Sequence, residues 1–290
     1  MLISAKDAIR AISEDSALIM DATFVLPNSG RDAFAEYLEQ RIPHAVFFDI
    51  NKIADDSSPL PHTMPDAEVF TRHMSALGLD SDQKVILYDQ SGMLSAARAW
   101  WMLRYFGHDH VVILDGGMTA WIDAGGTTES GVAAFPDKGS FIAKAPDVAS
   151  PMAIRSLDDM VALVATPPSE RPEQIIDARS SGRFSGKSPE PRPGMASGHM
   201  PGALSCPISH LIDADTGRCK SPAQIMSIFS EAGIDLDKPV VTSCGSGVTA
   251  CGLAFGFALI GKQDVSIYDG SWSEWGSPES DRITCPVVTG

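Results

Sequence analysis

The sequence predicts an α/β protein built from two similar domains, each with a mostly parallel sheet and helices on both faces. The first observation is an internal repeat, in which landmarks of the first half return about 155 residues later. The second is the alternation of short apolar runs with longer segments of helical spacing, which is typical of βαβ units. The third is the length of 290 residues, about twice that of an average domain.

The repeat consists of five pairs of short motifs in the same order. They are Leu18–Thr23 with Gln174–Arg179, Arg41–Ala45 with His199–Ala203, Lys84–Asp89 with Pro239–Cys244, Val112–Gly117 with Ser266–Ser271, and Trp121 with Trp275. The near-constant offset implies a duplicated domain. The prolines and glycines between the copies mark the join, so we expect domains at 1–140 and 151–290 with a linker at 141–150.

Within each half, the pattern predicts a strand, a helix and a second strand. The expected segments are Val85–Tyr88, Ala96–Phe106 and Val111–Leu114 in the first half, and Val240–Ser243, Ala250–Leu259 and Val265–Tyr268 in the second. Strand, helix and strand in this order form a parallel sheet, and ligands of such sheets bind at the carboxyl ends of the strands. The loops that follow Tyr88 and Ser243 are therefore the places to look for chemistry.

Charge and composition exclude several classes of protein. A net charge of −15 disfavours a surface for nucleic acid or for an anionic membrane, because both bind clustered Lys and Arg. No stretch reaches the ~18 apolar residues of a membrane span, and the first residues lack the pattern of a signal peptide. An odd number of cysteines without any CxxC pair argues against disulfides and structural zinc, so we expect a cytoplasmic protein. The five are Cys206, Cys219, Cys244, Cys251 and Cys285.

Cys244 is the expected nucleophile, because it ends a strand and begins a Gly-Ser-Gly turn that leads into a helix. Gly245 and Gly247 allow the backbone to adopt positive φ. The curl aims successive N–H groups at one centre, and the helix N-terminus adds a partial positive charge. Such a setting favours the thiolate and holds a persulfide anion after reaction. The alternative interpretation is a structural cysteine beside an ordinary βα turn.

The equivalent loop of the first half serves as an internal control. It runs from Asp89 to Ala96, is one residue longer, and has Asp89 where the second half has Cys244. Only one copy of the scaffold therefore carries a thiol. We expect a catalytic C-terminal domain and an N-terminal domain that lacks the nucleophile and shapes the cleft.

These motifs resemble those of the two-domain rhodanese family, over nearly the whole chain. The motifs that carry the resemblance are Phe47–Ile50, Ser58–His62, Asp115–Gly117, Pro189–Arg192 and Gly198–Gly202. The loop Cys244–Thr249 is similar to that of members that act on 3-mercaptopyruvate. Members that prefer thiosulfate have basic residues where this chain has Gly245 and Ser246. The resemblance implies a sulfurtransferase with two tandem rhodanese-like domains.

The resemblance also implies a set of substrate-binding residues. Arg183 and Arg192 correspond to family arginines that hold the carboxylate and keto oxygens of the donor, and a planar guanidinium suits this task because it binds a carboxylate in a bidentate manner. The remaining members of the set contribute backbone N–H groups to the anionic sulfur. These are Gly245, Gly247, Val248 and Thr249.

Two further residues are implied in proton transfer. Ser246 lies two residues beyond Cys244, and the resemblance links this serine to His62 in the first half of the chain. Histidine titrates in the range that a proton shuttle needs. Asn51 stands where the family has an acidic partner for the histidine, so this chain lacks that negative charge.

The expected reaction is a double displacement that needs neither a metal nor an organic cofactor. Cys244 takes sulfur from 3-mercaptopyruvate, pyruvate leaves, and the persulfide passes its sulfur to a thioredoxin-like protein, a small thiol or cyanide. One alternative is a thiosulfate:cyanide sulfurtransferase, and another is a non-catalytic persulfide carrier. A phosphatase of related fold is disfavoured, because its Cys-x5-Arg loop requires an arginine where this chain has Ala250.

Overall fold

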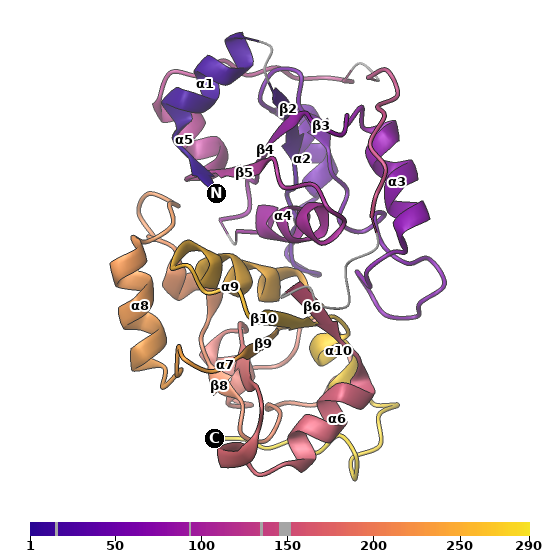
Figure 1. Cartoon of the computed structure of the whole chain (residues 1–290), viewed down its shortest axis with the longest axis vertical. Helices are drawn as coiled ribbons and strands as arrows, with labels where there is room; N and C mark the ends of the chain where they lie inside the picture. The colour runs from indigo at the N-terminus through magenta and orange to yellow at the C-terminus, as the bar shows by residue number, and fades with distance from the viewer. Residues whose placement is uncertain (15–16, 93, 134–135, 145–151) are drawn as a thin grey trace. The chain divides into compact units, whose positions relative to one another are not determined.

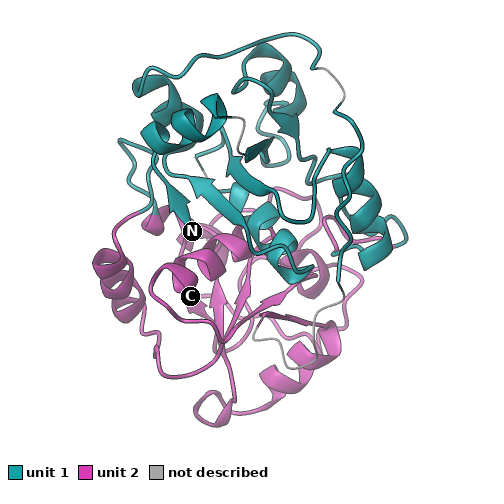
Figure 2. Cartoon of the chain, turned by 45° about the horizontal axis from the view of Figure 1, so that its top comes forward, with its two compact units in different colours: residues 1–57, 64–147, 212–219 teal, residues 58–63, 148–211, 220–290 magenta. Residues whose placement is uncertain are grey.

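The computed structural model describes residues 1–14, 17–92, 94–133, 136–144 and 152–290. The chain forms two compact units, coloured separately in Figure 2. The first comprises Met1–Ser57, Met64–Asp147 and Ile212–Cys219, and the second comprises Ser58–Thr63, Val148–Leu211 and Lys220–Gly290. The boundary between the units is therefore not a single point in the chain. Ser58–Thr63 lies in the first half of the sequence but belongs to the second unit, and Ile212–Cys219 lies in the second half but belongs to the first unit. Of the predicted linker 141–150, positions 145–150 lie outside the described residues.

The first unit contains a five-stranded sheet in the order β1-β5-β4-β2-β3, and its strand pairs are all parallel. Its helices are joined to the strands in the alternation that the sequence predicts (Figure 1). The strands are β1 (Leu2–Ile3), β2 (Ala17–Asp21), β3 (Val46–Phe47), β4 (Lys84–Tyr88) and β5 (Val111–Leu114). The helices are α1 (Ala5–Ser13), α2 (Ala33–Glu39), α3 (Ala67–Ala76), α4 (Ala96–Tyr105) and α5 (Gly117–Asp123).

The second unit repeats this topology in the order β6-β10-β9-β7-β8, again with parallel pairs. The strands are β6 (Met152–Arg155), β7 (Gln174–Asp177), β8 (Leu204–Ser205), β9 (Val240–Ser243) and β10 (Val265–Tyr268). The helices are α6 (Leu157–Ala165), α7 (Ser181–Phe184), α8 (Pro222–Glu231), α9 (Val248–Leu259) and α10 (Ser271–Trp275), with short 3-10 turns η1 (Pro168–Glu170) and η2 (Ile208–Leu211). The same strand order in both units confirms the predicted duplication.

The register of the central strands is also duplicated. Asp21 pairs with Tyr88 at the end of β2 and β4, and Asp177 pairs with Ser243 at the end of β7 and β9. The residue after each second strand therefore leaves its sheet at the same edge. In the second unit this residue is Cys244, so the fold brings the predicted nucleophile to the carboxyl edge of the sheet, where α/β proteins bind ligands.

Helix α9 anchors the loop after Cys244. Its side chains are buried from Val248 to Phe257 except at Thr249, and the helix packs on β9, β10 and η2. Burial of an apolar helix stabilises it by roughly 25 cal/mol for each Å² of apolar surface removed from water. No helix in the described part of the chain combines the length and the apolar character that a membrane span requires.

Candidate functional site in the second unit

Cys244 follows β9 directly and is almost completely buried, with 2% of its surface exposed. The turn after it closes at Gly247, whose φ of 81° lies in the left-handed region and starts α9. A side chain is strained at such a φ, so the second glycine of the Gly-Ser-Gly turn is required by the backbone. The predicted strand, turn and helix therefore position the thiol at the N-terminus of α9.

Four amides beside Cys244 have no acceptor in the part of the chain that the structure describes. Within the described residues, no hydrogen bond is formed by the N–H groups of Gly245, Ser246, Val248 and Thr249. The first N–H groups of a helix have no intrahelical partner, and together with the helix dipole they attract an anion. An anionic sulfur at the N-terminus of α9 would therefore find unused donors.

Gly247 behaves differently from the other members of the predicted set. Its N–H group donates to the Oγ of Ser271 at 3.1 Å, and the N–H group of Cys244 donates to the same oxygen at 3.2 Å. The Ser271 hydroxyl in turn donates to the carbonyl of Tyr268 at 2.8 Å. The Gly247 amide is therefore engaged in holding the loop.

Ser246 and His62 lie in hydrogen-bonding contact. The Oγ of Ser246 is 2.8 Å from the Nδ1 of His62, and both side chains are buried. His62 belongs to the segment Ser58–Thr63 of the second unit and has a φ of 62°, which is unusual for a residue with a side chain. A hydrogen bond of 2.9 Å between the hydroxyls of Ser58 and Thr63 ties the ends of this segment together.

Asn51 belongs to the first unit and is exposed. Its backbone N–H group donates to the carboxylate of Asp49 at 3.1 Å. The same carboxylate forms an ion pair of 3.1 Å with Lys52. The asparagine side chain carries no charge, so it cannot supply a negative charge at this position.

Arg183 is held by a carboxylate that the sequence analysis did not single out. Its Nε donates to the Oε2 of Glu190 at 3.0 Å, and its Nη2 contacts the same oxygen. The other oxygen of Glu190 accepts from Arg179 Nη1 at 2.7 Å. Glu190 thus fixes the direction of the Arg183 side chain.

Arg179 is a buried structural residue. It forms hydrogen bonds to both carboxylate oxygens of Asp177, donates to the carbonyl of Gly198, and stacks over the ring of Trp272 at 4.0 Å. Burial by itself lowers the pKa of Arg179, but the carboxylates of Asp177 and Glu190 outweigh it and raise the pKa. Arg179 is therefore a permanent cation that anchors Glu190.

Arg192 has neither a hydrogen bond nor an ion pair with any described residue. Burial lowers the pKa of this half-buried guanidinium, the nearby Cys244 sulfur opposes the shift, and Arg183 lowers the pKa further. A β-carbon at position 245 would lie 3.1 Å from Arg183 Nη2 and 3.9 Å from Arg192 Nη1. Both predicted arginines therefore lie beside the loop of Cys244, and a desolvated cation without a partner is what an anion site requires.

The other four cysteines are free thiols with structural environments. Burial raises the pKa of Cys206 and of Cys219 to about 12, and it also raises the pKa of Cys285. Thiolate, which is the nucleophilic form, is therefore scarce at these three residues at neutral pH. The Sγ of Cys251 donates to the carbonyl of Gly247 at 3.2 Å, so this side chain belongs to the first turn of α9.

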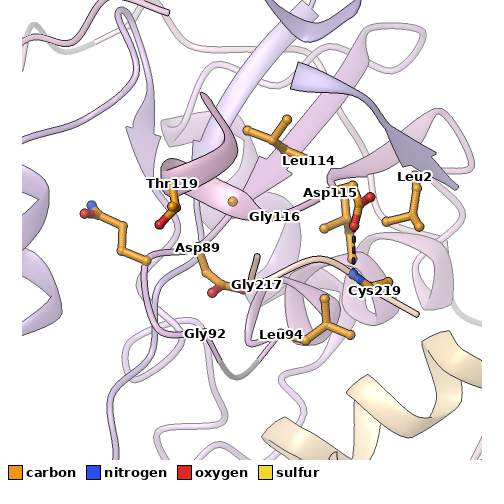
Figure 3. Close-up of a pocket in the computed structure, with 13 residues that line it drawn as sticks. Leu2, Asp89, Gly92, Leu94, Leu114, Asp115, Gly116, Thr119, Gly217 and Cys219 are labelled. Atoms are coloured by element: carbon orange, nitrogen blue, oxygen red, sulfur yellow. Dashed lines mark hydrogen bonds between the residues drawn. The ribbon is translucent and has the colours of Figure 1, made fainter. Parts of the chain in front are cut away.

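The equivalent loop of the first unit lies against a small pocket at the carboxyl ends of β4 and β5 (Figure 3). Asp89, Asp115, Thr119 and Cys219 line it, and the N–H group of Cys219 donates to Asp115 at 2.8 Å. Burial raises the pKa of Asp115, although the Cys219 amide opposes the shift. Within the described residues no group of His, Cys, Asp and Glu has the arrangement of a metal site, here or elsewhere.

Sequence reasoning missed Glu190 and Ser271. Each had a signal, since Glu190 lies inside the motif Pro189–Arg192, and Ser271 is the position at which Asp-Gly-Ser of the second half replaces Asp-Gly-Gly of the first. The partners of Glu190 are Arg179 and Arg183, which precede it in the chain, and the amide partners of Ser271 lie in the loop after β9. These contacts are visible only in the fold.

The chain matches the rhodanese-like domain twice, over residues 4–124 and 160–278. The human 3-mercaptopyruvate sulfurtransferase is 41% identical over 280 residues, which cover 94% of this chain and 91% of the relative. The enzyme of the same name from Escherichia coli K12 is 41% identical over 277 residues, which cover 95% and 93%. A plant relative from Arabidopsis thaliana, named as a thiosulfate/3-mercaptopyruvate sulfurtransferase, is 39% identical and covers 91% of this chain and 73% of its own length.

Solved structures agree with these sequence matches. The crystal structure of the Escherichia coli 3-mercaptopyruvate sulfotransferase superposes with a TM-score of 0.81 at 37% identity, and the match covers 94% of this chain and 99% of the other. The sulfur transferase subunit that is sub-stoichiometric in yeast mitochondrial complex I gives 0.87 at 31% identity, with coverage of 100% and 99%. The chain belongs to the rhodanese family and carries two rhodanese-like domains.

Proposed function

We propose that the protein is a sulfurtransferase that carries sulfur as a persulfide on Cys244. One observation supports the proposal above all others. A buried cysteine lies beside four N–H groups that have no acceptor among the described residues, and beside Arg192, which forms no ion pair with a described carboxylate. Amide donors stabilise the anionic sulfur, and the arginine attracts an anionic donor to it. The family to which the chain belongs adds to this support.

We propose 3-mercaptopyruvate as the donor, the substrate named for the human and bacterial relatives. Arg192 binds the carboxylate, because it forms no ion pair with any carboxylate of the described residues, and Arg183 binds the neighbouring keto oxygen. Gly245 leaves room between the loop and both guanidinium groups, since any side chain there would approach Arg183 Nη2. The two arginines orient the donor so that its sulfur faces Cys244.

In the first half of the reaction, the thiolate of Cys244 attacks the sulfur of the donor. A sulfur–sulfur bond forms, the carbon–sulfur bond breaks, and its electron pair stays on the carbon as the enolate of pyruvate. The proton of the donor thiol moves through Ser246 and His62 to that carbon, so pyruvate leaves and an anionic persulfide remains. The contact of 2.8 Å between Ser246 Oγ and His62 Nδ1 supports this proton path.

In the second half, an acceptor takes the outer sulfur. Attack by a thiolate or by cyanide breaks the sulfur–sulfur bond and restores the thiolate of Cys244, so neither a metal nor an organic cofactor takes part. We propose a thioredoxin-like protein or a small thiol as the physiological acceptor. Five free cysteines are consistent with the reducing environment of the cytoplasm, where such acceptors are abundant.

Steady-state kinetics test the proposal. Pyruvate release from 3-mercaptopyruvate should depend on the acceptor with ping-pong kinetics, and Cys244→Ser should abolish it. Cys251→Ser is the matched control, because this second buried thiol lies in the first turn of α9, outside the loop of Cys244, and should leave turnover intact. Turnover by Cys244→Ser would refute the assignment.

Thiosulfate is the second candidate donor, since a plant relative is named for both compounds. The loop argues against it, because Gly245 and Ser246 add no positive charge for a dianion. We expect a larger kcat/KM for 3-mercaptopyruvate than for thiosulfate. Equal values would remove the argument from the loop, and loading of Cys244 without any pyruvate release would favour a non-catalytic persulfide carrier.

A further inference from the structure

Two carbonyl groups of the loop after β9 are bonded to the first residues of α10. The carbonyl of Cys244 accepts from the N–H group of Trp272 at 3.0 Å, and the carbonyl of Gly245 accepts from the N–H group of Ser273 at 2.8 Å. The loop and α10 belong to the same unit, and Trp272 and Ser273 are buried. Water therefore competes little for these two bonds.

These bonds also determine where the next N–H groups point. A trans peptide group is planar and rigid, so its C=O and N–H bonds have opposite directions. The N–H of Gly245 shares a peptide group with the carbonyl of Cys244, and the N–H of Ser246 shares one with the carbonyl of Gly245. Because both carbonyls face α10, both N–H groups point away from it. They are two of the four amides that have no acceptor among the described residues.

We propose that the N–H groups of Trp272 and Ser273 position the amides of Gly245 and Ser246 for the anionic sulfur by fixing the direction of two peptide groups. The inference rests on the proposed function, in which these amides stabilise the sulfur on Cys244. Without the two bonds, either peptide group could rotate and present its carbonyl oxygen, which repels an anion, in place of its N–H. Trp272 and Ser273 are thus positioning residues that act through the loop.

The side chains of the same two residues hold the donors in place. The indole Nε1 of Trp272 donates to the carbonyl of Ala196 at 2.9 Å, and the guanidinium of Arg179 stacks over its ring at 4.0 Å. The hydroxyl of Ser273 donates to the carbonyl of Gly270 at 2.7 Å. Donors that are fixed in this way need no reorganisation when negative charge develops on the sulfur.

The first unit has only one counterpart of these two bonds among the described residues. The carbonyl of Asp89 accepts from the N–H group of Met118, at the longer distance of 3.3 Å. The residue equivalent to Ser273 is Thr119, and its N–H group forms no hydrogen bond to the loop of Asp89 within the described residues. The second bond is therefore found in the copy that carries the thiol.

Ser273→Pro tests the inference, because proline has no N–H group and is tolerated in the first turn of a helix. In assays of pyruvate release, kcat should fall about a hundredfold, as expected when a donor to a developing anion is lost. The KM for 3-mercaptopyruvate should change by less than about threefold, since the arginines that bind the donor are unaltered. Ser273→Ala keeps the N–H group, so its kcat should stay within about threefold of the wild type.

Thr119→Pro is the matched control, because it makes the same change at the equivalent position of α5 and should leave kcat unaltered. Amide hydrogen exchange in the wild type, followed by NMR at single residues, tests the inference without a substitution. The amides of Trp272 and Ser273 should exchange slowly and those of Gly245 and Ser246 faster, and loading of the protein with 3-mercaptopyruvate should slow the latter two.

Two results would overturn the inference and leave the proposed function intact. One is wild-type kcat in a folded Ser273→Pro protein, and the other is rapid exchange of the Trp272 and Ser273 amides in the wild type. A wild-type protein that neither releases pyruvate from 3-mercaptopyruvate nor gains sulfur would overturn the proposed function and the inference together.

Discussion

The two copies of the domain share a fold but differ in the hydrogen bonds of the equivalent loops, which follow β4 in the first unit and β9 in the second. In the first unit, Asp89 accepts hydrogen bonds from its own loop, from the N–H and Oγ of Ser91 at 3.1 and 2.9 Å and from the N–H of Ala96 at 3.0 Å. In the second unit, Cys244 takes that place, and the N–H groups of Gly245, Ser246, Val248 and Thr249 have no acceptor among the residues that the structure describes. The comparison teaches that a loop can bind an external anion only where no side chain of the protein already occupies its donors.

A second difference concerns the residue that supports each loop. Gly117 and Ser271 occupy equivalent positions, with φ values of 56° and 50°. In the first unit a β-carbon at Gly117 would lie 2.3 Å from the carbonyl oxygen of Asp89, so no side chain fits. The second unit has a serine at positive φ in this place, and its hydroxyl accepts hydrogen bonds from the N–H groups of Cys244 and Gly247.

The cations near the two loops differ as well. Arg31 donates to the carbonyl of Gln90 in the first loop, and it is paired with both oxygens of Glu36 at 2.6 and 2.7 Å. Arg192, beside the second loop, has no such partner among the described residues. In the first copy, Asp89 accepts from amides of its own loop and Arg31 pairs with Glu36. In the second, among the described residues, amides after Cys244 have no acceptor and Arg192 has no ion pair.

Moving the thiol between the copies should have the largest effect. The double variant Cys244→Asp/Asp89→Cys is expected to lose at least about a thousandfold in kcat, because the arginine beside the first loop, Arg31, is already paired with Glu36. Pyruvate release measures the loss, and circular dichroism checks the fold. The single variant Asp89→Cys should keep wild-type turnover. Activity in the double variant would show that Arg192 is dispensable.

Removing the charge of an arginine beside Cys244 should have the next largest effect. Arg192→Gln is expected to lower kcat/KM for 3-mercaptopyruvate about a hundredfold, since it removes a charge-assisted contact to the donor carboxylate. Arg183→Gln should cost less, about tenfold, because Glu190 already compensates that charge. Arg10→Gln, an exposed arginine in α1, is the control. Equal losses at positions 183 and 192 would remove the distinction between them.

Removing the support of the second loop should have a moderate effect. Ser271→Ala leaves the amides of Cys244 and Gly247 without their acceptor, so kcat should fall about tenfold and the protein should lose about 1–3 kcal/mol of stability. Ser271→Gly reproduces the first copy and relieves the positive φ, so it should recover part of the stability and none of the activity. Wild-type kcat in both variants would show that the hydroxyl does not position the nucleophile.

The smallest expected effect is on the pH dependence of stability, and it arises from a difference between Asp21 and Asp177, the aspartates at the ends of β2 and β7. Asp177 is paired with Arg179, but Asp21 has Thr23 at the equivalent place, and burial raises its pKa despite the hydrogen bonds from Thr23 and Gln90. A raised carboxyl pKa means that stability is lost as pH rises through it. Between about pH 4 and pH 7 the free energy of unfolding of the wild type should fall by on the order of 1 kcal/mol relative to Asp21→Asn. Parallel urea titrations that show no difference would contradict this assignment.

The strands and the loop of the nucleophile could be predicted from local sequence. Apolar runs located β4, β5, β9 and β10, and the glycines of the turn after Cys244 required the positive φ found at Gly247. These features depend on residues that are neighbours in the chain. The internal repeat extended the prediction to strand order, because both copies had to satisfy the same topology.

The supporting residues could not be predicted in the same way. His62 lies 184 residues from Ser246, and only the family resemblance suggested the pair. Glu190 and Ser271 gain their roles from partners on other elements, and no local periodicity encodes such contacts. The assignment of Ser58–Thr63 to the second unit likewise follows from tertiary packing.

Peptide mass spectrometry after treatment with 3-mercaptopyruvate alone tests the central claim most directly. Without an acceptor the reaction stops at the persulfide, so the Cys244 peptide should gain the mass of one sulfur atom while one equivalent of pyruvate is released. The peptides of the other four cysteines should remain unchanged. Sulfur on any of those four in place of Cys244, or pyruvate without sulfur on the protein, would contradict the account.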